Sequence, residues 1–182
     1  MEHEFDKPYW DEHWQHSHGG QPGPNPHLLI ETRDLTPGTA LDAGCGEGTE
    51  ALWLAAQGWA VTAVDIAAQA LARAAERTPP GTNLIWLEAD LSSWNPARTF
   101  DLVTTHYAHP TIPQLDFHDR VAGWVAPGGT LLIVGHASGG EHPERASVTA
   151  AEVVARLDQQ DWLVVTAEDR DHDVVVRAHR HH

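Results

Sequence analysis

The chain has 182 residues, of which 26 are acidic and 11 basic, giving a formal net charge of −15. This length predicts one domain over residues 1–182, and the negative charge disfavours nucleic acid and anionic membranes as partners, so we expect a small neutral or cationic molecule. No apolar run approaches the roughly 20 residues of a membrane span, and no signal sequence is recognisable. Cys45 is the only cysteine, so no intrachain disulfide can form. Together these features predict a cytoplasmic protein.

The first segment, residues 1–25, is polar and aromatic. It carries Tyr9, Trp10 and Trp14 and runs into the Pro- and Gly-rich stretch "GGQPGPNP", which predicts a flexible loop. Pro26 then occupies a favoured first position of a short helix over residues 26–35.

From residue 39 onward, apolar segments of strand type alternate with helical ones. The predicted strands are 39–43, 60–65, 83–90, 100–107 and 129–136, and a closing hairpin of 161–170 and 172–179 turns around Asp171. The predicted helices are 49–57, 66–77, 114–125 and 147–160. This alternation indicates an α/β fold whose mostly parallel sheet carries helices on both faces.

A glycine-rich loop follows the first of these strands. Gly44, Gly46 and Gly48 stand at every second position, between the strand and the next helix, where parallel α/β sheets bind ligands. Glycines there let a ligand approach the backbone. In the dinucleotide pattern G-x-G-x-x-G the third glycine comes one place later, and Glu47 would repel a pyrophosphate. The preceding acid, Asp42, favours a cation such as an ammonium or a sulfonium.

The stretch "LDAGCGEGT" resembles the cofactor loop of class I S-adenosylmethionine-dependent methyltransferases, and the resemblance continues in order from about residue 26 to the end. It implies a Rossmann-like three-layer sandwich with a seven-stranded, mostly parallel sheet and an antiparallel C-terminal strand. It also implies S-adenosylmethionine as cofactor and S-adenosylhomocysteine as product. Asp65, which ends "VTAVDI", would accept hydrogen bonds from the ribose hydroxyls, and Asp90 in "LEADL" would contact the adenine amino group.

The cofactor-binding residues expected on this basis lie on the first four strand ends. They are Asp42, Gly44, Cys45, Gly46, Gly48, Asp65, Ile66, Ala89, Asp90, Leu91 and Thr105.

The methyl acceptor is expected at the end of the fourth strand, "TTHYAHP". Methyl transfer from a sulfonium is an in-line displacement, in which the enzyme aligns the acceptor and excludes water, and some acceptors need a general base. We predict catalytic roles for His106, Tyr107 and His109, with His106 or His109 as the base because histidine titrates near neutrality. His136 is expected to converge on the same place.

No metal site is expected, because these histidines lack fixed spacing and a cysteine partner. Neither "NPPY" nor "DPPY" occurs, the motifs that in the similar family mark amino-group methylation of nucleic-acid bases and of some proteins, and their absence agrees with the charge argument against DNA and RNA.

Two interpretations of the aromatic N-terminal segment stay open. Tyr9, Trp10 and Trp14 either form a lid over cofactor and acceptor or pack as a helix face on the domain, as a hydrophobic staple. The segment "ASGGEHPERAS" is predicted to be a polar loop and not a helical cap, so only the N-terminus would cover the acceptor.

The main hypothesis is therefore methyl transfer to a small acceptor through oxygen, nitrogen, sulfur or a metalloid, similar to tellurite-resistance and thiopurine-type enzymes. The protein is expected to be a monomer or a homodimer. Two alternatives remain: a non-catalytic module that binds the cofactor, and a NAD-dependent oxidoreductase. Open space beside residues 104–109 would favour catalysis over the first alternative.

Overall fold

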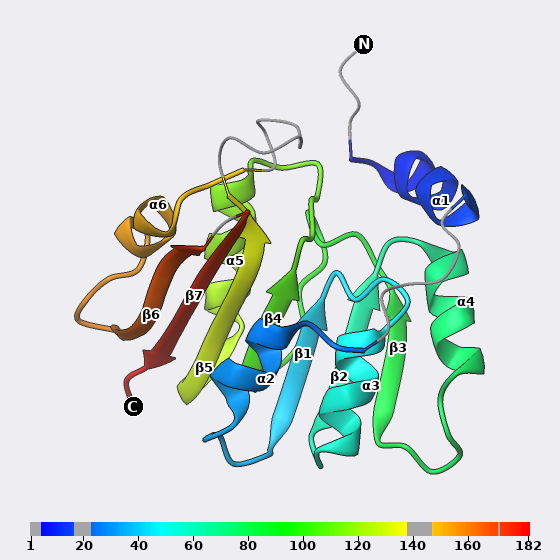
Figure 1. Cartoon of the computed structure of the whole chain (residues 1–182), viewed down its shortest axis with the longest axis horizontal. Helices are drawn as coiled ribbons and strands as arrows, with labels where there is room; N and C mark the ends of the chain where they lie inside the picture. Colours follow the sequence, from blue (N-terminus) through cyan, green and yellow to red (C-terminus); the bar gives the residue numbers. More distant parts are fainter. Residues whose placement is uncertain (1–4, 17–22, 138–146, 171) are drawn as a thin grey trace.

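The computed structural model describes residues 5–16, 23–137, 147–170 and 172–182. Within these residues the strands form one seven-stranded sheet in the order β3-β2-β1-β4-β5-β7-β6 (Figure 1). Every neighbouring pair is parallel except β5–β7 and β6–β7, so β7 alone runs against the other strands. The predicted α/β sandwich with an antiparallel C-terminal strand is confirmed.

The elements follow in alternation along the chain. The strands are β1 (Thr39–Ala43), β2 (Ala60–Asp65), β3 (Leu84–Glu88), β4 (Phe100–His106), β5 (Val125–His136), β6 (Trp162–Arg170) and β7 (Asp173–Arg180). The helices are α1 (Lys7–His16), α2 (Pro26–Thr32), α3 (Thr49–Ala56), α4 (Ala68–Glu76), α5 (Gln114–Gly123) and α6 (Ala150–Ala155).

Two hydrophobic clusters cover the two faces of the sheet. On one face, Leu28 of α2 and Leu54 of α3 pack on alternate strand residues such as Leu102. On the other face, Phe117 of α5 and Val153 of α6 pack on the intervening ones. Strands buried on both faces need near-continuous apolar runs, which explains why the central strands were recognisable in the sequence.

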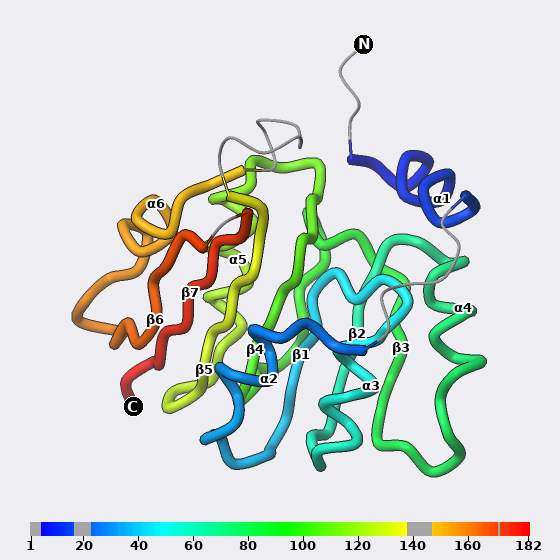
Figure 2. The backbone as a smooth tube through the Cα atoms, viewed as in Figure 1, coloured from blue at the N-terminus to red at the C-terminus, as the bar shows by residue number. Residues whose placement is uncertain are grey.

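The strand order reverses at the centre of the sheet. The chain moves outward from β1 to β2 and β3, then returns to β4 on the other side of β1. The loops after β1 and β4 therefore diverge and leave a crevice at the carboxyl ends of the strands. The backbone trace shows these ends at one edge of the sheet, with α1 on the same side near α4 (Figure 2).

Several predicted boundaries differ from the observed ones. α6 covers only Ala150–Ala155 of the predicted 147–160: it begins at Ala150 because Thr149 and Glu152 form a reciprocal capping box, and Arg156 is its C-cap. β5 begins at Val125, so the Pro-Gly-Gly sequence predicted as a preceding turn lies inside the strand, next to a register shift against β4.

Three predicted features fall partly or wholly outside the described residues: the loop over 19–26, the polar loop after residue 137, and the turn at Asp171. Among the described helices, none combines the length and the apolar character needed to cross a bilayer.

Candidate active site

A cavity of about 960 Å³ lies at the carboxyl edge of the sheet. Residues from the ends of β1 to β5, from the start of β7 and from α1 line it. This volume is at the upper end of the range for small-molecule sites and leaves room for two small ligands side by side.

The glycine loop forms the floor of the cavity at the end of β1. The amides of Gly44 and Cys45 both donate to the Val64 carbonyl, at 2.8 and 3.0 Å, which ties the loop to β2. Gly46 and Gly48 have φ values of 53° and 78°, in the left-handed region that favours glycine.

The two glycines differ in what surrounds them. A Cβ at Gly48 would lie 2.1 Å from the Trp86 ring, inside the packed core, so this glycine is required by packing. A Cβ at Gly46 would meet only Trp14 of α1, at 2.8 Å. Gly46 thus presents its backbone to the space beneath α1, as a ligand-facing glycine should.

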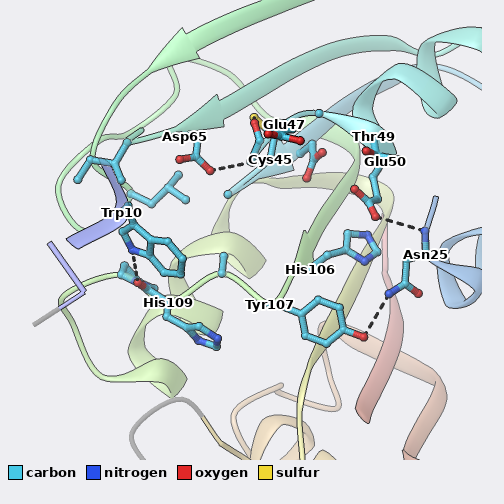
Figure 3. Close-up of a pocket in the computed structure, with 18 of the residues that line it drawn as sticks. Trp10, Asn25, Cys45, Glu47, Thr49, Glu50, Asp65, His106, Tyr107 and His109 are labelled. Carbon is cyan, nitrogen blue, oxygen red and sulfur yellow. Dashed lines mark hydrogen bonds between the residues drawn. The ribbon is translucent and has the colours of Figure 1, made fainter. Parts of the chain in front are cut away.

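Asp65 ends β2 and holds the loop in place. Its carboxylate oxygens accept hydrogen bonds from the amide of Gly46, at 2.8 Å (Figure 3), and from the amide of Ala67, at 2.9 Å. The side chain is buried, and desolvation raises its pKa. Each carboxylate oxygen has a second lone pair, so Asp65 retains acceptor capacity toward the cavity.

Asp90, at the end of β3, also lines the cavity. Its Oδ1 accepts a hydrogen bond from the Ser92 amide at 2.8 Å. The neighbouring residues Ile66, Ala89 and Leu91 line the same region, so the structure brings all of these predicted cofactor contacts together.

Asp42 of β1 is nearly inaccessible to solvent, at 1% relative exposure, and its Oδ2 has no hydrogen-bond partner among the described residues. Desolvation, followed by the nearby charges of Glu50 and Asp65, raises its pKa well above the usual range. A buried carboxylate oxygen without a partner is costly, and a cationic ligand in the cavity would relieve that cost.

Glu50, in the first turn of α3, is a cavity residue that the sequence analysis missed. Its Oε1 accepts a hydrogen bond from the Asn25 amide at 3.2 Å, and burial raises its pKa (Figure 3). The signal was present in the sequence, because a helix that starts at a glycine loop directs its first turn toward the ligand site.

His106, the last residue of β4, lines the cavity, but its environment differs from the one predicted. Its Nε2 is 2.8 Å from Thr104 Oγ1, and its Nδ1 is buried without a described partner. Burial lowers the pKa of His106 to about 3. The expectation that His106 titrates near neutrality is therefore wrong, since desolvation disfavours the imidazolium.

Tyr107 follows with a φ of 55°, the only positive value of a non-glycine residue in the described part of the chain. Asn25 Nδ2 donates to its hydroxyl at 3.2 Å (Figure 3), and burial, followed by the nearby Asp173 carboxylate, raises the pKa of Tyr107. Tyr107 thus remains a neutral phenol. Strained backbone of this kind persists where the surroundings enforce it, and it clusters at functional sites.

His109 and His136 meet across the loop after β4. Their ring centroids are 5.3 Å apart at an interplanar angle of 26°, and both line the cavity. His109 Nδ1 lies 3.2 Å from Gln114 Oε1, and Gln114 in turn donates to the Ala108 carbonyl at 2.9 Å. The predicted convergence of these two histidines is thereby observed, and their catalytic role stays a prediction.

Thr105 is the one predicted cofactor contact that does not line the cavity. Its side chain is buried, and its hydroxyl donates to the Ala43 carbonyl at 2.8 Å, which joins β4 to β1. Cys45 does line the cavity, but burial raises the pKa of its thiol well above the usual range, so it is not a thiolate.

Helix α1 closes the cavity from above. Lys7 Nζ donates to the Ile66 carbonyl at 3.0 Å and pairs with Glu88 at 2.9 Å. Trp10 Nε1 donates to the His109 carbonyl at 3.3 Å (Figure 3). The helix therefore spans the cavity from the end of β2 to the loop after β4, yet none of its own residues is buried. Tyr9, Trp10 and Trp14 all line the cavity, as a lid requires.

Several further cavity residues come from segments without a sequence motif. They are Phe5, His13, Asn25, His27, His172 and Asp173. In the described residues, no group of three or more histidine, cysteine or acidic side chains is arranged to hold a metal ion.

Comparison with known proteins agrees with this arrangement. The family model of a methyltransferase domain matches residues 40–129, which contain the glycine loop, Asp65, Asp90 and the end of β4. The chain belongs to the class I S-adenosylmethionine-dependent methyltransferases.

Among curated relatives of this methyltransferase, probable thiol methyltransferase 2 of Arabidopsis thaliana is 29% identical over 160 residues, covering 80% of the chain and 70% of the relative. Trans-aconitate 2-methyltransferase of Streptomyces avermitilis is 30% identical over 136 residues, covering 68% of the chain and 49% of the relative. The chain spans about half the length of this and several other curated relatives.

The fold has close counterparts among solved structures. Magnesium protoporphyrin IX methyltransferase from Synechocystis, with bound S-adenosylhomocysteine, superposes with a TM-score of 0.73 at 15% identity, and 96% of this chain and 97% of that one are covered.

The family membership confirms the predicted methyl-transfer function, the enzyme class and the cofactor S-adenosylmethionine. The NAD-dependent alternative is thereby set aside.

Proposed function

We propose that this methyltransferase transfers the methyl group of S-adenosylmethionine to a small molecule bound at the end of β4, beneath α1. The observation that carries the proposal is the single cavity that joins Gly46, Asp42 and Asp65 to the open space beside residues 106–109. A non-catalytic module would not need space there, so this continuity favours catalysis.

The residues present fit the cofactor. Gly46 turns its backbone toward the cavity, with only the Trp14 ring of α1 among the nearest neighbours of a Cβ there, and Asp42 Oδ2 is a buried carboxylate oxygen without a described partner. When bound, S-adenosylmethionine supplies an activated methyl group on a sulfonium. Asp65 and Asp90 would hold its ribose and adenine, and Asp42 would face its positive charge.

The remaining residues would bind the acceptor and exclude water. Trp10 and His109 close the cavity between α1 and the loop after β4. Tyr107 would donate or accept a hydrogen bond as a neutral phenol, and His109 would hold the acceptor or take its proton. His106, being neutral at physiological pH, would act as a hydrogen-bonding and packing group.

We also propose that the protein acts in the cytoplasm as a single domain, monomeric or homodimeric, without nucleic-acid or membrane partners. The single buried cysteine and the net charge of −15 support this proposal.

Ligand-dependent thermal stability tests the function. S-adenosylhomocysteine at 100 times its dissociation constant should stabilise the protein by about 2.7 kcal/mol, while NADH should not. Homocysteine release from a panel of amines, phenols, thiols and metalloid oxyanions then identifies the acceptor. Stabilisation by NADH alone, or cofactor binding without turnover of any acceptor, would contradict the proposal.

A further inference from the structure

The cavity has acidic side chains but no permanently cationic ones. Six carboxyl groups and six histidines line it, and none of the described residues that line it is a lysine or an arginine. The six carboxyl groups are those of Asp42, Glu47, Glu50, Asp65, Asp90 and Asp173. One cationic cofactor does not require so many.

Four of these carboxylates have other tasks. Glu47 pairs with Arg73 at 2.8 Å. Asp42, Asp65 and Asp90 are assigned to the cofactor under the proposed function. Glu50 and Asp173 remain, and the partner of Asp173 is a histidine, His27, and not a lysine or an arginine.

Both remaining carboxylates lie close to Tyr107. Asn25 connects Glu50 to the Tyr107 hydroxyl, through its amide at 3.2 Å and its side chain at 3.2 Å. Asp173 pairs with His27 Nε2 at 3.1 Å and lies near enough to Tyr107 that its carboxylate, after burial, raises the pKa of the phenol. The two acidic groups left over therefore both lie beside this phenol.

A row of aromatic rings, the aromatic wall, lines the same cavity and ends at Tyr107. The rings of Phe5, Trp10, His109, His136 and Tyr107 follow one another at centroid distances of 4.7–6.4 Å. Successive planes are inclined by only 21–32°. Ring faces next to carboxylates are the surroundings in which proteins recognise organic ammonium groups.

We propose that the methyl acceptor is an organic amine that enters with its nitrogen protonated, and that carboxylates, phosphates and thiolates are excluded. This proposal rests on the proposed function. An anionic acceptor would find carboxylates and no described lysine or arginine in the cavity, and a thiol would be held in its less nucleophilic neutral form.

The chemistry balances with the groups present. The ammonium gives a proton to Asp173 and becomes a neutral amine. The nitrogen lone pair then forms the new bond to the methyl carbon while the carbon–sulfur bond breaks, its electron pair staying on sulfur. The positive charge ends on the methylated nitrogen, where Glu50 and the aromatic wall again stabilise it.

Isosteric probes test the proposal directly. We would measure binding to the protein saturated with S-adenosylhomocysteine, by calorimetry, for 2-phenylethylamine, tryptamine and pentylamine. The matched acids are 3-phenylpropionate, indole-3-propionate and hexanoate, and the matched thiols carry the same three carbon chains. At least one amine should bind tenfold or more tightly than its acid and thiol and should be methylated with S-adenosylmethionine.

Equal or tighter binding of an acid or thiol, or no binding of any amine, would overturn the proposal. Failure of S-adenosylhomocysteine itself to bind would instead contradict the proposed function, so the two failures are distinguishable.

Substitutions test which carboxylates give the cavity its preference for amines over acids. Asp173→Asn and Glu50→Gln should each reduce the amine-over-acid preference about tenfold, with the affinity for S-adenosylhomocysteine changed less than threefold. The matched control is Asp116→Asn, which removes a charge on α5 that pairs with Arg156 outside the cavity and should leave the preference unchanged. Retention of the full preference in both cavity variants would refute the assignment.

Discussion

The contrast between Gly46 and Gly48 gives the most direct test of the site. Both have φ values in the left-handed region, where a non-glycine residue costs about 1–2 kcal/mol. In Gly46→Ala the new methyl group meets only Trp14 on a helix with no buried residues, so α1 can shift and the loss should stay near that range.

In Gly48→Ala the methyl group would lie 2.1 Å from the Trp86 ring and 3.1 Å from Ala74, within packed structure. Overpacking adds about 1–3 kcal/mol to the backbone cost. A change of 1 kcal/mol shifts the melting temperature of a chain of this length by about 2–4 °C. We therefore expect Gly48→Ala to melt several degrees below Gly46→Ala.

The order should reverse for ligand binding. Gly46→Ala places a methyl group where the cofactor would touch the backbone and should weaken S-adenosylhomocysteine binding about ten- to hundredfold, which is about 1.4–2.7 kcal/mol. Calorimetry and urea unfolding of both variants measure the two effects. The double variant Gly46→Ala/Trp14→Ala removes the collision with the lid and should not restore affinity. Unchanged affinity in Gly46→Ala, or a Gly48→Ala variant as stable as Gly46→Ala, would refute the reasoning.

Three further predictions concern charged groups. Asp42→Asn should weaken cofactor binding yet raise the melting temperature of the ligand-free protein at pH 7–8, because the raised pKa of Asp42 makes its ionisation unfavourable in the folded state. This gain in melting temperature should shrink as the pH falls toward 4, and a gain independent of pH would contradict the prediction. His106→Gln should leave the pH dependence of kcat/KM between pH 5 and 8 unchanged, since the pKa of His106 is about 3. If the unmodified enzyme shows a titration near pH 6.5 that is absent from this variant, His106 is the general base after all. Lys7→Met should change the free energy of unfolding by less than about 0.5 kcal/mol, because its ion pairs are exposed, but should weaken S-adenosylhomocysteine binding severalfold by releasing the lid. The control Glu88→Gln keeps the hydrogen bond from Lys7 to the Ile66 carbonyl and should bind S-adenosylhomocysteine with nearly unchanged affinity.

Local sequence pattern was sufficient to predict the central strands of the fold and the cofactor half of the site. The apolar runs that end in Asp42 and Asp65 are central strands, and the glycine loop between them can only lie at the carboxyl edge of a parallel sheet. The cofactor half of the cavity follows from that placement. Thr105 does not line the cavity, because the residues of a strand point alternately to opposite faces and its hydroxyl donates to the Ala43 carbonyl within the sheet.

The acceptor half depends on contacts between distant segments. Asp173 reaches the cavity because the antiparallel register pairs it with His136, and no local motif specifies that register. Asn25 reaches Tyr107 because α2 packs across the sheet on Leu28. The low pKa of His106 likewise arises from burial, which depends on how the whole site is packed. Residue type and position were enough to predict that His106 belongs to the site, but not to predict its protonation state.

The same carboxylates that would bind the cofactor destabilise the site without it. Asp42 and Asp65 are buried at the ends of adjacent strands, and desolvation raises the pKa of both. For Asp65 the amides of Gly46 and Ala67 offset part of that cost, and the same two bonds fix the glycine loop before any ligand arrives. Asp42 Oδ2 has no such compensation among the described residues, so its ionised form needs a positive charge in the cavity. A site arranged in this way gains most from a ligand that brings a cation, because binding then relieves a cost already present in the folded protein.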